Sequence, residues 1–136
     1  MENIDIPATL MNARAILPFT DEYGGTSFNL LACKNVEIYA GYRTAVPTGV
    51  SLEIPPGYIG IITSEPHVSL NKSVDAISEI IDCNFRGEIV ITIANFSKQR
   101  THYIECGDTI AKLNIVKVPI TTMTRVRLLN CVEGKG

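Results

Sequence analysis

The stretch Ile80-Ile-Asp-Cys-Asn-Phe-Arg-Gly-Glu-Ile-Val-Ile-Thr-Ile-Ala-Asn95 decides the fold. Its second half, Glu88 to Asn95, is apolar on nearly both faces. A strand with this pattern is buried between two layers instead of alternating between core and solvent. Its first half is an apolar run that ends at Asp82 and leads into a turn. The stretch therefore predicts a buried strand of a layered β structure.

Two further strands are predicted before this stretch. Val50–Ile54 alternates between apolar and polar residues, which is typical of a half-buried strand. Pro55-Pro-Gly57 combines a fixed φ with a residue that tolerates φ > 0, as a type II turn requires. The turn leads into a second strand at Tyr58–Thr63.

More strands are predicted after the stretch. Glycine at the centre of Cys106-Gly-Asp108 indicates a primed hairpin turn between strands at Thr101–Glu105 and Thr109–Val118. One last strand is predicted at Thr124–Leu129. Only Val74–Glu79 is ambiguous, because its pattern fits a helical turn as well as a hairpin.

The composition is that of one folded domain. The chain has 136 residues, of which 46% are hydrophobic, and 7 prolines and 10 glycines divide it into short segments. This pattern favours an all-β sandwich or small barrel. We expect a single domain over 1–136, with loosely ordered tails at 1–12 and 130–136, and the length excludes a two-domain enzyme.

Charge and cysteine usage exclude several classes of protein. Twelve basic and fourteen acidic residues give a net charge of -2, which is not the charge of a nucleic-acid or membrane-surface binder. The chain has no apolar run of membrane-spanning length and begins with acidic residues, unlike a signal peptide, so we expect it to be intracellular. Four scattered cysteines without CxxC predict reduced thiols and no zinc site.

Three segments together resemble the trimeric dUTPase family. They are Ile80–Glu88, Asn95-Phe96 and Gly107–Leu113, and they correspond in order and spacing to the family's G-V-I-D-x-D-Y-R-G-E, F-N and G-D-R-I-A-Q-L. The similarity extends without gaps from Gly25 to Leu113. It implies a distorted β-jelly roll that assembles as a homotrimer, with each active site shared among subunits.

The resemblance also implies roles for two residues. In the family an aspartate orients the water that attacks the α-phosphorus, and an aromatic ring under the deoxyribose excludes a 2'-hydroxyl. Asp82 corresponds to the aspartate and Phe85 to the ring, without its hydroxyl. From the residues alone, two other interpretations remain open: Asp82 as the cap of a turn, and Phe85 as a core or interface ring.

The phosphate-binding segment of the family differs strongly in this chain. There the family holds the triphosphate with serine, arginine and glutamine, a Gly-rich C-terminal arm and magnesium. Glu65 stands at the arginine position, Pro66 at the serine position and His67 at a glycine. A carboxylate repels phosphate, and proline offers neither a hydroxyl nor a backbone N–H.

Other family positions are also changed. Glu79 ends the segment that replaces the glycines of the uracil-binding hairpin, so we expect side chains to fill part of that pocket. Asn84 and Asn29 stand at aspartate positions, and Lys112 stands at the glutamine position. Lys112 is either an aid to phosphate binding or a solvent-facing strand lysine. The ending Asn130–Gly136 lacks the family's arm.

These departures lead to two functional expectations. The main one is a protein of the dUTPase fold that has lost dUTP hydrolysis and serves in interaction or regulation, like the dUTPase-like accessory proteins of some DNA viruses, with a host or cellular protein as partner. The alternative is an active or weak dUTP diphosphatase, which forms dUMP and pyrophosphate and uses Mg²⁺. An intact Asp82 favours the alternative; Glu65, Pro66, Glu79 and the missing arm favour the main expectation.

Overall fold

The computed structural model describes residues 3–65 and 73–132. Within these ranges the chain forms eleven strands and no helix, so the predicted all-β class is confirmed. The strands are β1 (Ala8–Leu10), β2 (Ser27–Leu31), β3 (Val36–Ile38), β4 (Arg43–Pro47), β5 (Val50–Leu52), β6 (Tyr58–Ser64), β7 (Val74–Ala76), β8 (Glu79–Ile81), β9 (Val90–Asn95), β10 (His102–Ile104) and β11 (Thr109–Lys117).

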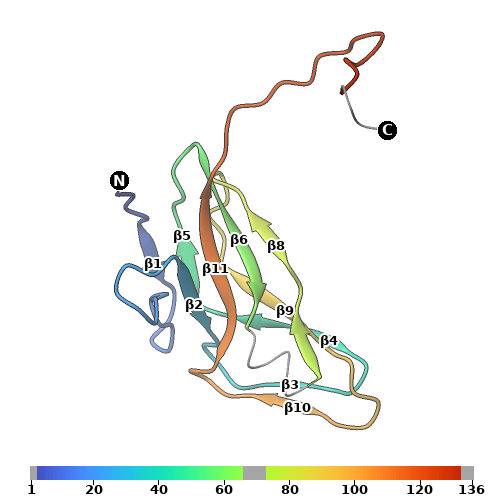
Figure 1. The fold of residues 1–136 in the computed structure, drawn as a ribbon. Helices are drawn as coiled ribbons and strands as arrows, with labels where there is room; N and C mark the ends of the chain where they lie inside the picture. Colours follow the sequence, from blue (N-terminus) through green and yellow to red (C-terminus); the bar gives the residue numbers. More distant parts are fainter. Residues whose placement is uncertain (1–2, 66–72, 133–136) are drawn as a thin grey trace.

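The strands form two main antiparallel sheets and two short ribbons (Figure 1). The larger sheet has the order β2-β11-β6-β8 and the smaller one β4-β9-β7, while β1 pairs with β5 and β10 with β3. Side chains from both main sheets meet in one hydrophobic core, to which Leu30, Ile62 and Leu113 come from the larger sheet and Val46 and Ile93 from the smaller. The molecule is therefore a β sandwich.

Strand β9 lies at the centre of the smaller sheet. Ile91 and Ile93 point into the core and are almost fully buried. Val90 and Thr92, on the other face, are only half-buried. Ala94, on the same outer face, is buried, so the predicted burial of both faces is complete on the inner face and partial on the outer face.

The two predicted turns have different outcomes. The type II turn is confirmed: Gly57 has φ 91°, and the Tyr58 N–H donates to the Pro55 carbonyl at 3.2 Å. The primed hairpin at Cys106-Gly-Asp108 is wrong. A primed turn needs positive φ at its first central residue, but Gly107, the second, carries it, and β10 and β11 pair with other strands.

Three further segments differ from the predictions. Val74–Glu79 is neither a helical turn nor a hairpin, because β7 pairs with β9 in one sheet and β8 with β6 in the other. Ala8–Leu10, inside the expected N-terminal tail, pairs with β5. The predicted strand at Thr124–Leu129 is wrong: residues 119–132 run away from the body and have no neighbouring strand to pair with (Figure 1).

Among the described residues, no helix is long and apolar enough to cross a membrane.

Candidate active site

Three of the residues singled out from the sequence line one pocket. Glu79, Asp82 and Phe85 surround a hollow of about 320 Å³ where β8 ends and β9 begins. Ligand pockets usually have about 300–1,000 Å³, so the volume suits a small substrate. Asp82 and Phe85 are both exposed to solvent there. The pocket therefore brings a carboxylate and an aromatic ring to the same opening.

The turn that carries Asp82 and Phe85 is held by hydrogen bonds along its backbone. The Phe85 N–H donates to the Asp82 carbonyl at 3.1 Å, which closes the turn. The Arg86 guanidinium donates to the carbonyls of Cys83 at 2.6 Å and Phe85 at 3.1 Å. The Ser51 hydroxyl donates to the Arg86 carbonyl at 2.6 Å and ties the turn to β5. The positions of Asp82 and Phe85 are thus fixed before any ligand binds.

The residues after the turn fasten it to the core. The Thr48 side chain, fully buried, donates to the Ile89 carbonyl at 2.6 Å. Glu88 accepts a hydrogen bond from the Gly49 N–H at 2.8 Å. Residues 48–51, far away in sequence, therefore support the segment 82–90 that lines much of the pocket.

Phe85 packs on Gly87. A Cβ atom added to Gly87 would lie 2.8 Å from Cζ and 3.1 Å from Cε1 of the Phe85 ring. Only glycine allows the ring to lie this close to the backbone. Phe85 remains 40% exposed, so the ring is presented to the pocket and is not a core residue.

Glu79 and Asn84 have different surroundings. Glu79 lines the pocket and is exposed, so its side chain leaves the hollow open. The reason is that β8 starts at Glu79 and directs this side chain to the solvent side. Asn84 is exposed on the turn, 3.9 Å from the Cys83 sulfur, and does not line the pocket.

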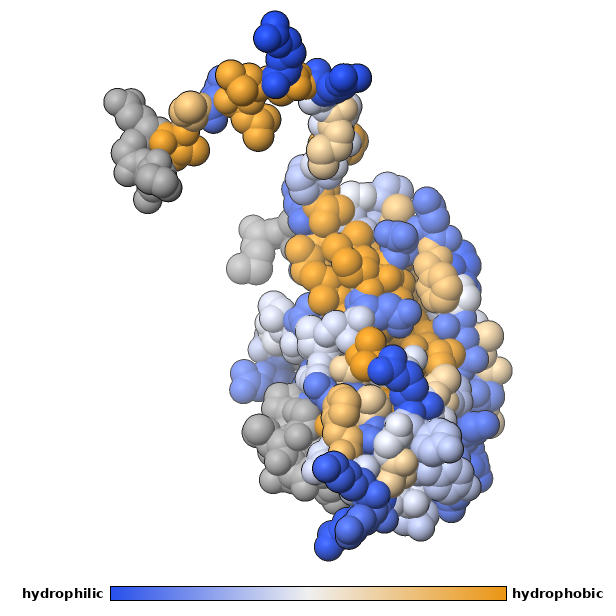
Figure 2. Space-filling model, turned by 90° about the vertical axis from the view of Figure 1, so that its right-hand side faces the viewer, coloured by the Kyte–Doolittle hydropathy of each residue, from blue (hydrophilic) through white to orange (hydrophobic). Residues whose placement is uncertain are grey.

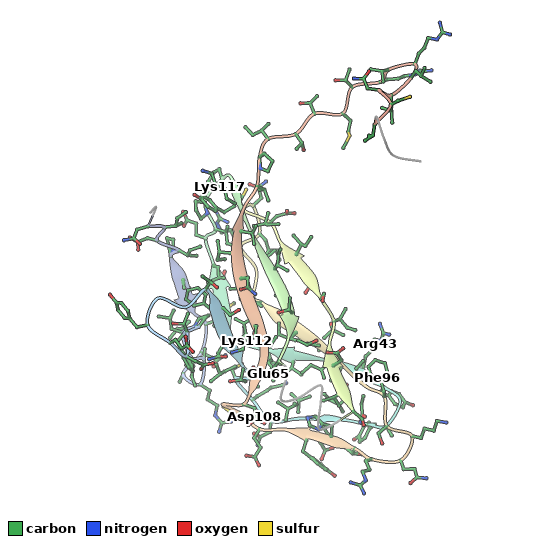
Figure 3. The ribbon with its side chains drawn as sticks, viewed as in Figure 1. Arg43, Glu65, Phe96, Asp108, Lys112 and Lys117 are labelled. Atoms are coloured by element: carbon green, nitrogen blue, oxygen red, sulfur yellow. The ribbon has the colours of Figure 1, made fainter. Side chains whose placement is uncertain are left out.

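Asn29 and Lys112 lie in a second cluster that shares no residue with this pocket. They are opposite each other in the β2–β11 pair, and the Lys112 ammonium donates to the Asn29 side-chain oxygen. The same ammonium is 3.1 Å from Asp21 Oδ2 and 3.6 Å from Glu65 Oε2 (Figure 3). With its side chain only 17% exposed, Lys112 is not the solvent-facing lysine considered above.

Asp21 is a member of this cluster that the sequence did not indicate. Its Oδ1 accepts a hydrogen bond from Asn29 Nδ2 at 2.8 Å. Because lysine only donates and carboxylate only accepts, the Asn29 amide has a single orientation that serves both. The hydrogen bond from Asn29, followed by the hydrogen bond and charge of Lys112, lowers the pKa of Asp21. Asp21 lies in a loop, and it reaches both partners because the β2–β11 register places Asn29 opposite Lys112.

Glu65 joins the cluster from the end of β6 and is buried. Asn29 and Glu65, at the family's aspartate and arginine positions, therefore both contact Lys112, at the glutamine position. The changed charge of Glu65 is thus coupled to the changed charge of Lys112. Pro66 and His67, the other changed positions of this segment, lie outside the described residues.

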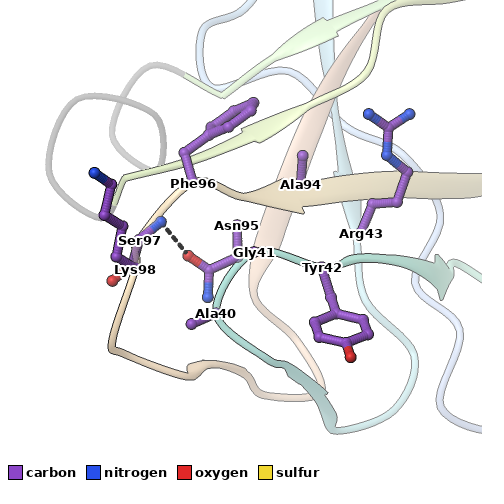
Figure 4. A pocket seen from close by; sticks show the side chains of 9 residues that line it. All are labelled: Ala40, Gly41, Tyr42, Arg43, Ala94, Asn95, Phe96, Ser97 and Lys98. Carbon is purple, nitrogen blue, oxygen red and sulfur yellow. Dashed lines mark hydrogen bonds between the residues drawn. The ribbon is translucent and has the colours of Figure 1, made fainter.

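A second hollow, of about 340 Å³, lies between β4 and the end of β9. Tyr42, Arg43, Phe96 and Lys98 line it, with no carboxylate among its lining residues. Figure 4 shows the rings of Tyr42 and Phe96 pointing to opposite sides of the backbone. It therefore offers neither a slot for a flat base nor a general base, and it is not the candidate active site.

No group of three or more histidine, cysteine or acidic side chains that could hold a metal ion is found in 3–65 and 73–132. Mg²⁺ usually binds through one or two carboxylates together with water and substrate phosphates. Glu79, Asp82 and Glu88 are the carboxylates that line the pocket. The donors present thus suit a Mg²⁺ that arrives with a triphosphate.

The comparison with known proteins defines first the class of the fold. The Staphylococcus bacteriophage 80alpha dUTPase with dUPNHPP superimposes with a TM-score of 0.91 at 20% identity, over 97% of this chain and 94% of that one. A mutant dUTPase from phage phi11 of S. aureus, described with a structural Mg(II) ion, gives 0.87 at 20% identity, over 92% and 98%. The fold is a distorted β-jelly roll of the dUTPase type.

Sequence comparison defines the family. The dUTPase family model matches residues 13–134. A deoxyuridine 5'-triphosphate nucleotidohydrolase of Syntrophotalea carbinolica is 31% identical over 134 residues, which are 96% of this chain and 90% of that protein. The same enzyme name is carried by a protein of Paramecium bursaria Chlorella virus 1, 28% identical over 76% of this chain and 73% of its own. The chain belongs to the dUTPase family.

These relatives overturn the expectation of a non-catalytic interaction protein. They are named as hydrolases, and similarity to them covers nearly the whole chain. The expectation rested on Glu65, Pro66, Glu79 and the missing arm, but Glu65, which was counted there as a repulsive charge, is paired with the Lys112 ammonium. It also counted Glu79 against ligand binding, whereas this side chain is exposed and lines the pocket.

Proposed function

We propose that the protein hydrolyses dUTP to dUMP and pyrophosphate. Family membership supports this activity. The observation that carries it is the open pocket with Asp82 and Phe85 on one braced turn. A fixed carboxylate and a fixed ring are the two groups that hydrolysis and discrimination of the sugar require.

Asp82 acts on the water. Its exposed carboxylate accepts a hydrogen bond from a water molecule and directs the oxygen to the α-phosphorus. As the new P–O bond forms, the bond to the bridging oxygen of the β-phosphate breaks, pyrophosphate leaves, and the proton of the water passes to Asp82. A Mg²⁺ bound by the triphosphate would supply neutralisation of charge on the leaving group.

Phe85 acts on the sugar. Its ring, supported by Gly87, presents an apolar face to the pocket. A deoxyribose can pack on such a face without losing a hydrogen bond. A ribose would bury its 2'-hydroxyl without a partner, at a cost of about 1–3 kcal/mol. Phe85 is thus the residue that selects deoxyribose.

We also propose a homotrimer with sites shared between subunits. Two observations support assembly. Figure 2 shows hydrophobic side chains gathered on the face that carries β8, where Ile80 is 62% exposed. Residues 119–132 leave the body with Ile120 fully exposed. Apolar surface of this kind marks contacts with other chains. An interaction with a further protein stays a prediction.

A single experiment tests activity and assembly. The purified protein, with Mg²⁺, is expected to release pyrophosphate from dUTP and not from UTP, and native mass spectrometry is expected to give three times the chain mass. Absence of pyrophosphate release from dUTP at micromolar enzyme contradicts the proposed activity. A stable monomer at the same concentration contradicts the shared site.

Gly87→Ala is expected to raise the KM for dUTP about tenfold with little loss of stability, because the new methyl group displaces the Phe85 ring while Gly87 has no positive φ. Steady-state kinetics measure the effect. Phe85→Leu serves as the control because it removes the ring. In this variant the additional Gly87→Ala change should raise the KM for dUTP less than twofold. An equal effect in both backgrounds contradicts the role of the ring.

A further inference from the structure

Two hollows border each other where β9 ends. The first, of about 340 Å³, is the hollow between β4 and the end of β9 described above. The second, of about 370 Å³, is lined by the loop that follows β9 and by the start of β10. Asn95 and Ser97 line both hollows. We call the two hollows together the basic groove, because Arg43, Lys98 and Arg100 line it.

The three cations of the basic groove are exposed and unpaired in the described part of the chain. None of the side chains of Arg43, Lys98 and Arg100 takes part in an ion pair or a hydrogen bond within residues 3–65 and 73–132. Neither hollow has an aspartate or a glutamate among its described lining residues. The groove therefore presents positive charge that these residues do not neutralise.

Exposed aromatic rings accompany the cations. Tyr42 and Phe96 in the first hollow and Tyr103 in the second are 66%, 66% and 64% exposed. The Phe96 ring and the Arg43 side chain lie on the same side of β9, with the small Ala94 between them (Figure 4). Aromatic residues and arginine are enriched at protein interfaces, where carboxylates are depleted. This combination indicates a surface that contacts another protein.

We propose that the basic groove binds an acidic, extended segment of a partner protein. Carboxylates of the partner pair with Arg43, Lys98 and Arg100, and its apolar side chains pack on the exposed rings. Charge complementarity selects this occupant. The whole chain carries a net charge of -2, so an acidic partner is received only where cations gather without carboxylates. The proposal does not depend on dUTP hydrolysis.

A nucleic acid fits the basic groove less well than a peptide. Single strands are bound by rings on which successive bases stack along a basic channel. Tyr42 and Phe96 point to opposite sides of the backbone, so they do not form a continuous stack (Figure 4). The side chains of an extended peptide point alternately to two sides and need no stack. The geometry of the rings therefore favours a peptide.

The floor of the basic groove is held in place by hydrogen bonds. Asn95 is 2% exposed, and its Nδ2 donates to the carbonyls of Ile38 at 2.9 Å and Arg100 at 2.8 Å. Its Oδ1 accepts from the Ser97 N–H at 3.0 Å, and the Ser97 hydroxyl accepts from the Arg100 N–H at 3.0 Å. These bonds fix the loop that carries Lys98 and Arg100. A ligand therefore spends little free energy on ordering this loop.

Two carboxylates lie on strands next to the basic groove. Asp75, on β7, accepts a hydrogen bond from the Ser64 hydroxyl. Glu37, on β3, accepts one from the Tyr39 hydroxyl at 3.3 Å. Neither carboxylate forms an ion pair with a cation of the groove. The cations thus remain available to carboxylates of a partner.

The test is fluorescence anisotropy with a short labelled peptide of alternating glutamate and leucine at low ionic strength. Arg43→Gln/Lys98→Gln is expected to weaken binding about three- to tenfold, because each exposed ion pair contributes a modest part of the affinity. Arg14→Gln/Lys34→Gln is the matched control: it removes one arginine and one lysine at exposed positions outside the groove. It should change the affinity less than twofold. Since all four side chains are exposed, both variants should fold.

Two further probes complete the test: the same peptide with glutamine in place of glutamate, and an oligothymidylate of equal charge. Both are expected to bind the wild type more weakly than the acidic peptide. Equal affinity of the two double variants for the acidic peptide, equal affinity of the two peptides, or no binding of the acidic peptide overturns the proposal. Tighter binding of the oligothymidylate also overturns it and assigns the groove to nucleic acid.

Native mass and dUTP hydrolysis are measured on the same variants. Both are expected to be unchanged in Arg43→Gln/Lys98→Gln, because neither residue lines the pocket at Asp82. A lower native mass for this variant, but not for Arg14→Gln/Lys34→Gln, overturns the proposal, because the groove is then a contact between copies of the chain. Loss of peptide binding with hydrolysis retained supports the groove, and a wild type that binds the peptide without hydrolysing dUTP supports it equally.

Discussion

Asp82→Asn is expected to lower the rate of pyrophosphate release from dUTP by about 10²- to 10⁴-fold, the usual contribution of a general base. The amide has the shape of the carboxylate but cannot take the proton of the attacking water. Folding and assembly should be unchanged, because the turn is closed by the Asp82 carbonyl and by Arg86, not by the carboxylate. Stopped assays of pyrophosphate measure the rate, and thermal melting measures stability.

Asp5→Asn serves as the control for Asp82→Asn. Asp5 is also exposed and lies near the N-terminus, outside the pocket, so its substitution should leave the rate within twofold. A rate for Asp82→Asn within tenfold of the wild type would remove Asp82 from the mechanism. A large loss of stability would instead support the interpretation of Asp82 as a structural cap.

The sequence predicts the parts of this fold that depend on local pattern. The apolar run to Asn95 predicts a buried strand, and Pro55-Pro-Gly57 predicts its turn, because side-chain period and φ preference are properties of neighbouring residues. Pairing between strands is not local. Gly107 therefore suggested a hairpin that the structure does not contain, and β7 and β8 enter different sheets although two residues separate them.

The candidate site divides in the same way. Asp82 and Phe85 could be selected because they share one short motif, and a single turn carries both. The cluster of Asp21, Glu65 and Lys112 could not, because the β2–β11–β6 register joins three distant segments. Considered alone, Glu65 at an arginine position reverses the charge that a phosphate would meet. In the structure, Glu65 forms an ion pair with Lys112.

Contact between changed positions also explains why hydrolysis is compatible with this sequence. A buried carboxylate without a partner would cost several kcal/mol, so Glu65 needs a cation nearby. Lys112 supplies it across the β6–β11 pair. The pocket at Asp82 lies on β8 and β9 and is not altered by this exchange. The changes at Glu65 and Lys112 therefore leave the surroundings of Asp82 unaltered.

Ile91→Asp is expected to prevent folding. Ile91 is 1% exposed, lies at the centre of the smaller sheet opposite Val46, and belongs to the core cluster. A carboxylate there loses its hydration and finds no cation among the core side chains, which costs several kcal/mol in addition to the lost apolar contacts. The total stability of a domain is about 5–15 kcal/mol. Soluble expression, circular dichroism and melting measure the outcome.

Thr92→Asp is the control that tests whether burial of the side chain, and not its location on β9, makes a carboxylate unacceptable. Thr92 is the next residue on β9 and is half-buried on the outer face, where a carboxylate keeps water within reach. Thr92→Asp places the same aspartate on the same strand as Ile91→Asp, but on the half-buried face, so the Thr92→Asp protein should still fold. Should Ile91→Asp instead yield a soluble protein with cooperative, near-native melting, then β9 does not bury this side chain. Failure of both variants would mean that the strand itself, and not its inner face, rejects the charge.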